Sequence, residues 1–186
     1  MRVRETNKKD IEEKFLEMSE YMSMDYLASC LKNHLDFDTR KFVLVKLSGL
    51  FEAKAMFLDA AKAMKSAAEI NTNKQNKIND FTKSGELFIR GGDYDRADIC
   101  MKKATSLAEG KQTEEVKGMI KEFYKTHARS CIERNKRKQA IAIYEKLVTF
   151  DLVEEEKKEF EKKLLELYEG VGDLDRYKKL QRRISN

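Results

Sequence analysis

The sequence contains no proline and no tryptophan, and only eight of its 186 residues are glycine. An all-β fold needs frequent turns between its strands, and proline and glycine supply most of them. The lack of proline therefore argues against a turn-rich β-sandwich or barrel. Apolar runs are only a few residues long, far short of the about 20 residues that a membrane-spanning helix requires. We therefore expect no transmembrane segment.

Cysteine is also scarce, and its three positions, Cys30, Cys100 and Cys131, are 70 and 31 residues apart. An odd number of widely spaced cysteines does not suggest a disulfide framework or a zinc site. The basic residues at the start of the chain lead into a charged amphipathic stretch instead of the apolar core of a signal peptide. We expect three buried thiols in a protein of the reducing cytoplasm.

Helical periodicity dominates what is present. Near the start, apolar residues recur at i, i+4, i+7 and i+11, which is one face of a helix: Ile11, Phe15, Met18 and Met22. Ser23 is a candidate N-cap for a second helix. A third, long segment runs from about Thr39 to Ile70, and the polar run Asn71–Asn76 ends it as a turn. These segments predict an all-α protein.

Turn signals divide the rest of the chain into helices of ordinary length. Glycines that tolerate a left-handed C-cap stand in Gly91–Gly92, at Gly110 and in Gly170–Gly172. Aspartates that can cap the following helix come after the first and third of these signals. Asp151 precedes an acidic helix start with the spacing of a capping box.

Two of these turns are near copies that indicate an internal repeat. Gly92-Asp93-Tyr94-Asp95-Arg96 matches Gly172-Asp173-Leu174-Asp175-Arg176, 80 residues later. A polar turn at Asn135–Ala140 lies midway between them. The spacing predicts a unit near 40 residues, within the range of helical repeat proteins.

Around the first of these turns the sequence resembles the tetratricopeptide repeat (TPR) family. The family pattern alternates large, small and aromatic residues on two antiparallel helices. It fits the chain at Phe81, Gly85, Phe88, Gly92, Ala97, Met101 and Ala104. Small residues at Gly85 and Ala97 would let two helices approach closely, while the two phenylalanines fill the space around them.

Weaker units flank this one, and together the resemblance covers about residues 42–184. They are an upstream unit at Leu44, Ser48, Phe51, Ala60, Met64 and Ala67, a following unit at Tyr124, Ala128, Cys131, Ala140, Tyr144 and Leu147, and a last one at Leu165, Tyr168, Gly172 and Tyr177. Their spacing exceeds the usual 34 residues and is similar to that of the SNAP-type vesicle-fusion adaptors. The resemblance implies a right-handed α-solenoid of antiparallel helix pairs. We expect an N-terminal helical hairpin or cap over 1–38 and one continuous solenoid over 39–186. The competing interpretation is a generic helical bundle.

No residue pattern indicates catalysis, a cofactor or a bound metal. Gly91–Gly92 lacks the strand and the Lys-Ser/Thr of a phosphate loop. His127 and Cys131 lie at i, i+4 and could begin a metal site, but no further ligand is indicated and both occupy packing positions of the repeat. We therefore expect a protein that is not an enzyme.

Binding to another protein or peptide is the function that the resemblance implies, because helical solenoids present an extended concave face to partners. The Lys and Asn clamp with which some members hold a chaperone C-terminus does not fit: Thr82 and Glu86 stand at its first positions. The repeat register instead gives a mixed-charge groove for a polar or amphipathic segment: Asn79, Thr82, Glu86, Glu122, Lys125 and Arg129. The same residues also suit plain solvated surface.

The net charge of +5 is concentrated in the last segment. Five cations and no acid occur among residues 176–184: Arg176, Lys178, Lys179, Arg182 and Arg183. The rest of the chain has equal numbers of basic and acidic residues. This basic end is an alternative site for nucleic acid or an anionic surface, although Tyr177 is its only aromatic for base stacking. A segment of a longer solenoid is a third interpretation of the chain.

Overall fold

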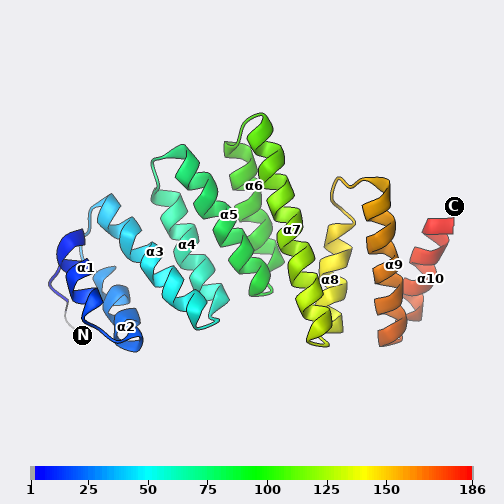
Figure 1. Ribbon diagram of the computed structural model, residues 1–186, viewed down its shortest axis with the longest axis horizontal. Coiled ribbons are helices and arrows are strands. Elements are labelled where there is room, and N and C mark those ends of the chain that lie inside the picture. The colour runs from blue at the N-terminus through cyan, green and yellow to red at the C-terminus, as the bar shows by residue number, and fades with distance from the viewer. Residues whose placement is uncertain (1–2, 186) are drawn as a thin grey trace. The chain divides into compact units, whose positions relative to one another are not determined.

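The computed structural model describes residues 3–185. Within this range the chain is built of helices and contains no strand, which confirms the all-α prediction (Figure 1). None of the described helices is both long and apolar enough to cross a membrane. The helices are α1 (Lys8–Leu16), α2 (Glu20–Cys30), α3 (Phe37–Ala53), α4 (Phe57–Ile70), α5 (Lys74–Arg90), α6 (Tyr94–Leu107), α7 (Lys111–Glu133), α8 (Arg137–Leu147), α9 (Glu154–Val171) and α10 (Leu174–Ser185).

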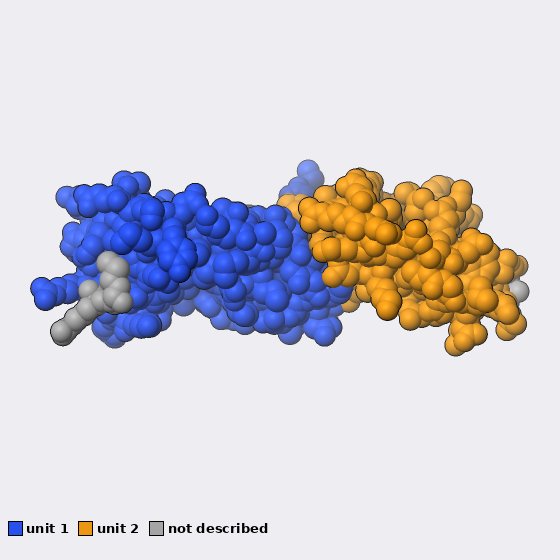
Figure 2. All heavy atoms as spheres, turned by 90° about the horizontal axis from the view of Figure 1, so that it is seen from below, with its two compact units in different colours: residues 1–117 blue, residues 118–186 orange. Residues whose placement is uncertain are grey.

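The chain divides into two compact units, residues 1–117 and residues 118–186 (Figure 2). We call them unit 1 and unit 2; helix α7 begins in the first and continues in the second. In unit 1 each helix from α1 to α6 packs against the next one in sequence, and in unit 2 α8 packs on α9 and α9 on α10. The N-terminal hairpin predicted over 1–38 lies inside unit 1, and its boundary with a following solenoid stays a prediction.

The first three helices enclose a small apolar core. The hydrophobic stripe of α2 buries Tyr26, Leu27 and Cys30 completely against Val43 of α3 and Ile11 of α1. Asn33, just after α2, donates a hydrogen bond from Nδ2 to the carbonyl oxygen of Val3 and so holds the N-terminal segment against the hairpin (3.1 Å). Side-chain burial thus fixes the hairpin α1–α2 to α3, and this polar contact fixes the N-terminal segment to the hairpin.

The alanine-rich helix α4 packs between α3 and α5. Its alanines are fully buried on two flanks, because residues 60 and 67 share one side of the helix and residues 61 and 68 another: Ala60, Ala61, Ala67 and Ala68. The Ser48 hydroxyl of α3 donates to the carbonyl oxygen of Ala60 (2.8 Å), and the Ser84 hydroxyl of α5 donates to that of Ala61 (2.9 Å). Small side chains therefore allow three helices to approach closely, while the buried hydroxyls of Ser48 and Ser84 each have a backbone acceptor.

Helices α5 and α6 meet at Gly85. A Cβ placed on Gly85 would lie 2.7 Å from the Sδ atom of Met101, closer than real Cβ contacts occur. The turn between the two helices uses Gly92 in the left-handed region (φ 79°), and Asp93 accepts the backbone N–H of Arg96 at the start of α6 (3.0 Å). The predicted glycine turn and aspartate cap are both confirmed here.

Unit 2 has its own apolar interior between α8, α9 and α10. Tyr144 of α8 packs against Phe160 of α9 with ring centroids 5.9 Å apart, and Leu164 of α9 and Leu180 of α10 are also buried. Gly172 again adopts a left-handed conformation (φ 74°) at the end of α9. This repeats the predicted turn.

Two predicted helices have different bounds. The long segment expected over 39–70 is two helices, because the chain turns at Ala55 in a left-handed conformation (φ 57°) and the N–H of Met56 bonds back to the carbonyl of Phe51 (2.8 Å). The apolar stripe expected to run from Ile11 to Met22 on one helix is interrupted at residues 17–19, so Met22 belongs to α2.

Two predicted caps are also wrong. Ser23 is not the N-cap of α2: it lies inside the helix, where its hydroxyl donates to the carbonyl of Ser19, which is the N-cap (2.9 Å). Asp151 does not cap α9, whose N-cap is Val153 without a side-chain hydrogen bond. In α9 the three glutamates of the first turn supply the negative charge that a helix N-terminus favours.

Candidate functional site

The predicted groove residues of α5 differ in what they present to solvent. Asn79 is exposed, and its Oδ1 accepts a hydrogen bond from Gln75 Nε2 (3.1 Å). Thr82 is only 6% exposed, and its hydroxyl donates to the carbonyl of Ile78 in its own helix (2.9 Å). Glu86 is half-buried, and its carboxylate accepts a hydrogen bond from Lys83 Nζ (3.1 Å). On α5, Asn79 is therefore the accessible group, whereas Thr82 offers a partner little surface.

Glu86 belongs to a charge network that joins three helices. The Glu52 carboxylate of α3 accepts hydrogen bonds from Lys83 (3.0 Å) and from Arg90, both on α5. The Arg90 guanidinium also lies 3.5 Å from the Glu86 carboxylate. The Arg90 guanidinium stacks over the Phe57 ring of α4, 4.2 Å from its centroid. Burial acts to raise the pKa of Glu52, but the hydrogen bonds and charges of Lys83 and Arg90 outweigh burial and hold the pKa below its ordinary value. Sequence reasoning missed this network because its partners are about 30 residues apart.

The predicted groove residues of α7 lie in unit 2, beside a second ion-pair network. Lys125 donates to Glu122 of the same helix (2.9 Å) and lies 3.8 Å from Glu156 of α9. Lys121 donates to Glu156 at 2.7 Å, and this hydrogen bond is the main reason that the pKa of Glu156 lies below its ordinary value. Arg129 is exposed and forms no ion pair with the residues described. A partner can reach Arg129 without displacing an existing contact.

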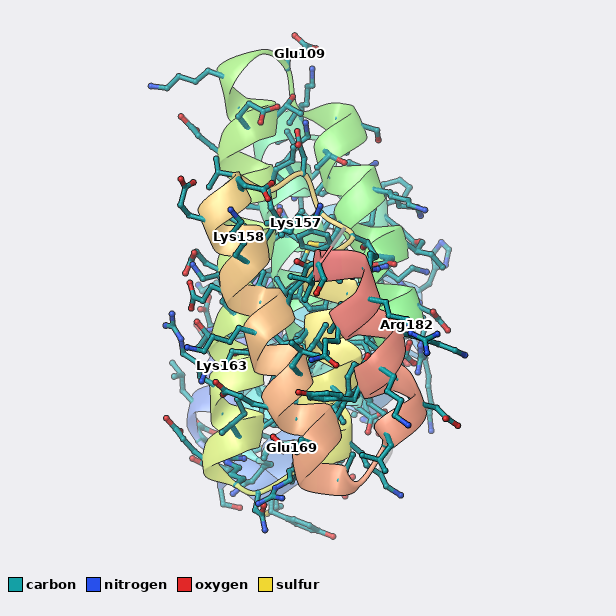
Figure 3. The ribbon with its side chains drawn as sticks, turned by 90° about the vertical axis from the view of Figure 1, so that its right-hand side faces the viewer. Glu109, Lys157, Lys158, Lys163, Glu169 and Arg182 are labelled. Atoms are coloured by element: carbon teal, nitrogen blue, oxygen red, sulfur yellow. The ribbon has the colours of Figure 1, made fainter. Side chains whose placement is uncertain are left out.

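Only part of the basic end carries uncompensated charge. Arg176 of α10 bonds to Glu145 of α8 (2.9 Å) and to Asp173 (2.9 Å). Arg183 bonds to Glu161 of α9 (3.1 Å). The other three cations are exposed, and within the described range they form no ion pair: Lys178, Lys179 and Arg182. Figure 3 shows Arg182 on α10 together with labelled charged residues of α9.

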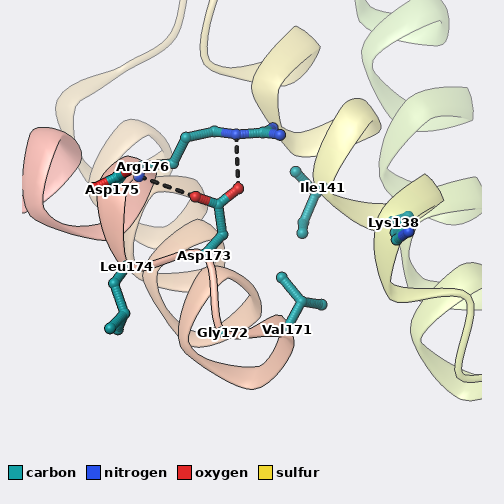
Figure 4. A pocket seen from close by; sticks show the side chains of 8 residues that line it. All are labelled: Lys138, Ile141, Val171, Gly172, Asp173, Leu174, Asp175 and Arg176. Carbon is teal, nitrogen blue, oxygen red and sulfur yellow. Dashed lines mark hydrogen bonds and ion pairs between the residues drawn. The ribbon is translucent and has the colours of Figure 1, made fainter.

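The α9–α10 turn forms one wall of an open pocket of about 620 Å³ (Figure 4). Apolar side chains from α8 and the turn line it: Ile141, Val171 and Leu174. Asp173 stands at its edge and is already engaged, since it accepts both the backbone N–H and the guanidinium of Arg176. Charged residues complete the lining, so the pocket is mixed in character: Lys138, Asp173, Asp175 and Arg176. Nothing in the sequence pointed to this pocket, because residues of three helices, α8, α9 and α10, make it.

His127 and Cys131, the possible start of a metal site, lie with Nε2 and Sγ 3.8 Å apart on α7. Cys131 is buried, and its sulfur also lies 3.9 Å from Gln139 Oε1. Burial raises the pKa of the Cys131 thiol, as it does for Cys30 and Cys100. No group of three or more His, Cys, Asp or Glu side chains placed to hold a metal ion occurs between residues 3 and 185.

Comparison with known proteins finds no family model and no curated protein that matches the chain.

Proposed function

We propose that this chain is a non-enzymatic adaptor that binds a segment of another protein through the exposed faces of α5 and α7. In this proposal its helix pairs stack as a TPR-like, right-handed solenoid in the cytoplasm. The observation that carries it is the close approach of α5 and α6 at Gly85, where Met101 fills the space that a side chain would need. This is the packing that the repeat pattern requires of a small residue at that position.

The burial of the other repeat positions supports the proposal. The upstream unit buries its small residues Ser48, Ala60 and Ala67. The following unit buries all of its key positions: Tyr124, Ala128, Cys131, Ala140, Tyr144 and Leu147. In the two units on either side of the Gly92 turn most packing positions are thus buried, whereas Phe51 of the upstream unit and Leu165 and Tyr177 of the last unit are only partly buried. The groove positions Asn79, Glu122 and Arg129 are exposed.

The polar groups of the interior favour binding over catalysis. The hydroxyls of Ser48, Ser84 and Thr82 all donate hydrogen bonds to backbone carbonyls. The buried thiols have raised pKa values, and a thiol must ionise to act as a nucleophile. These buried hydroxyls are therefore engaged in packing contacts, and the buried thiols are held in their protonated form.

The test is capture of partners from the native cell by the wild-type chain and by an Asn79→Lys/Arg129→Glu variant, with identification by mass spectrometry. These positions are chosen because reversing Lys125 would replace a cation that lies 3.8 Å from Glu156 with a like charge and disturb the ion pairs between α7 and α9. We expect the recovery of specific partners to fall about tenfold, which corresponds to about 1.4 kcal/mol of binding free energy. The matched control is Arg134→Glu, an exposed cation in the α7–α8 turn, which should recover the wild-type set. Equal recovery by all three proteins would contradict the proposal.

The second candidate is nucleic-acid or anionic-surface binding by α10, favoured by the exposed cations Lys178, Lys179 and Arg182. Counterion release makes such binding weaken with salt, with a log–log slope of about −3 if three phosphates are contacted. A salt titration with a labelled RNA or DNA oligonucleotide measures this slope. No binding at low salt would dismiss this candidate.

A further inference from the structure

The hairpin α1–α2 leaves large apolar side chains in solvent within an acidic stretch. Leu16 is 75% exposed and Tyr21 74% exposed, on either side of the turn that joins the two helices. Residues 10–25 contain six acidic residues and one basic residue. Glu13 and Glu20 lie beside lysines, whereas Glu17 and Asp25 are exposed and form no ion pair with any described residue. We call Leu16, Glu17, Tyr21 and Asp25 the acidic hairpin patch.

The acidic hairpin patch faces outward because of helical geometry. Tyr21 and Asp25 lie four residues apart on α2, so their side chains share one face of the helix. Tyr26, Leu27 and Cys30 occupy the opposite side and are fully buried. The patch is therefore a surface that the core of α1–α3 does not use.

Helix α10 presents the complementary arrangement. Leu174 is 59% exposed, and Lys178 and Arg182 follow it at intervals of four residues along one face. The opposite side is fixed to α9 by the burial of Leu180 and by the bond between Arg183 and Glu161. We call Leu174, Lys178 and Arg182 the basic stripe.

We propose that the basic stripe of one chain docks on the acidic hairpin patch of a second copy of the same chain. Each surface interleaves exposed apolar side chains with charges that form no ion pair with the residues described, and the two charges have opposite sign. Docking would cover Leu16, Tyr21 and Leu174 and would place Lys178 and Arg182 beside Glu17 and Asp25. The two surfaces differ, so the contact is head-to-tail, and further copies can add at either end. This inference does not depend on the proposed adaptor function.

The primary experiment is sedimentation velocity of the full chain over a range of protein concentrations. We expect the average mass to rise above the 21.8 kDa of one chain as concentration increases. The association constant obtained from this rise should fall by about tenfold when the salt concentration increases from about 50 mM to about 500 mM, because salt screens exposed charges. A mass that stays at one chain at low salt and high concentration would overturn the proposal.

Two charge-reversal variants test the polarity of the contact. In Glu17→Lys/Asp25→Lys both surfaces are basic, and in Lys178→Glu/Arg182→Glu both are acidic, so each variant alone should remain a monomer. A mixture of the two should associate as the wild type does, because each patch then meets a stripe of opposite sign. Circular dichroism melting checks that both variants are folded. A mixture that stays monomeric would overturn the head-to-tail contact.

The matched control is Arg134→Glu/Lys136→Glu, two exposed cations in the α7–α8 turn, which makes the same change of net charge as Lys178→Glu/Arg182→Glu. It should associate like the wild type. Loss of association in this control would show that net charge, and not the basic stripe, drives assembly. Wild-type self-association that survives both reversals would assign it to another surface, which also overturns the proposal.

Discussion

Among single residues, Gly85 decides how closely α5 and α6 pack. Gly85→Ala gains about 1 kcal/mol of helix propensity but forces the buried Met101 side chain to move, and overpacking costs about 1–3 kcal/mol. We expect a net loss of about 1 kcal/mol in the free energy of unfolding, measured by urea denaturation. Gly49→Ala is the matched control: it lies in α3 with no atom within 4 Å of the new Cβ, so it should stabilise the protein by up to about 1 kcal/mol. Stabilisation by both changes would contradict the close approach.

Two tyrosine hydroxyls allow a second comparison of single residues. The Tyr26 hydroxyl is buried, and the group it interacts with is the Cys30 thiol, a weak hydrogen-bonding partner, whereas the Tyr168 hydroxyl donates to Glu145 (2.7 Å). Burial, followed by this hydrogen bond, raises the pKa of Tyr168 to about 12. Tyr26→Phe should leave the free energy of unfolding unchanged or raise it by up to about 1 kcal/mol, and Tyr168→Phe should lower it by about 1–2 kcal/mol. The reverse order of the two effects in thermal melts would contradict these hydrogen-bond assignments.

At the scale of helices, the sequence predicted those junctions that carry glycine or a well-placed aspartate. Gly92, Gly110 and Gly172 all adopt positive φ at predicted turns. The junction at Ala55 was missed because alanine gives no local signal for a left-handed conformation, which tertiary packing imposes on it. Asp151 wrongly indicated a side-chain cap for α9, which instead begins after Val153 without a capping hydrogen bond. Three glutamates in the first turn supply the negative charge there.

The Glu52 network ties α3 to α5 and predicts a pH dependence of stability. The folded-state pKa of Glu52 lies below its ordinary value of 4.5, so the unfolded chain takes up the proton first as pH falls. The stabilisation is complete above about pH 4.5 and is lost as pH falls through the folded-state value. Glu52→Gln should therefore be less stable than the wild type at neutral pH and should lose less stability on acidification below 4.5. Parallel stability curves for the two proteins, measured by urea denaturation, would contradict this role.

For the whole molecule, the repeat pattern predicted most of the buried side chains of the units around Gly92, but it did not predict the ion pairs between partly exposed side chains. The burial of Phe81, Phe88 and Ala97 follows from spacing along two helices, which a sequence displays directly. The ion pairs Glu52–Lys83 and Lys121–Glu156 join helices that are two apart in the chain, and no local pattern encodes such a distance. Of the six predicted groove residues, Thr82 is the one that lies buried. The helical period alone does not show whether a residue at the edge of the exposed face is accessible or belongs to the core.

The central claim, that exposed residues of α5 and α7 contact a partner protein, is tested most directly by photo-crosslinking in the native cell. A photoreactive amino acid is placed at Asn79, at Arg129 or, as a control, at Ile99, which is exposed on α6. We expect covalent adducts with the same partner from positions 79 and 129, and a much lower yield from position 99. Adducts formed from position 99 but not from 79 or 129 would contradict this claim.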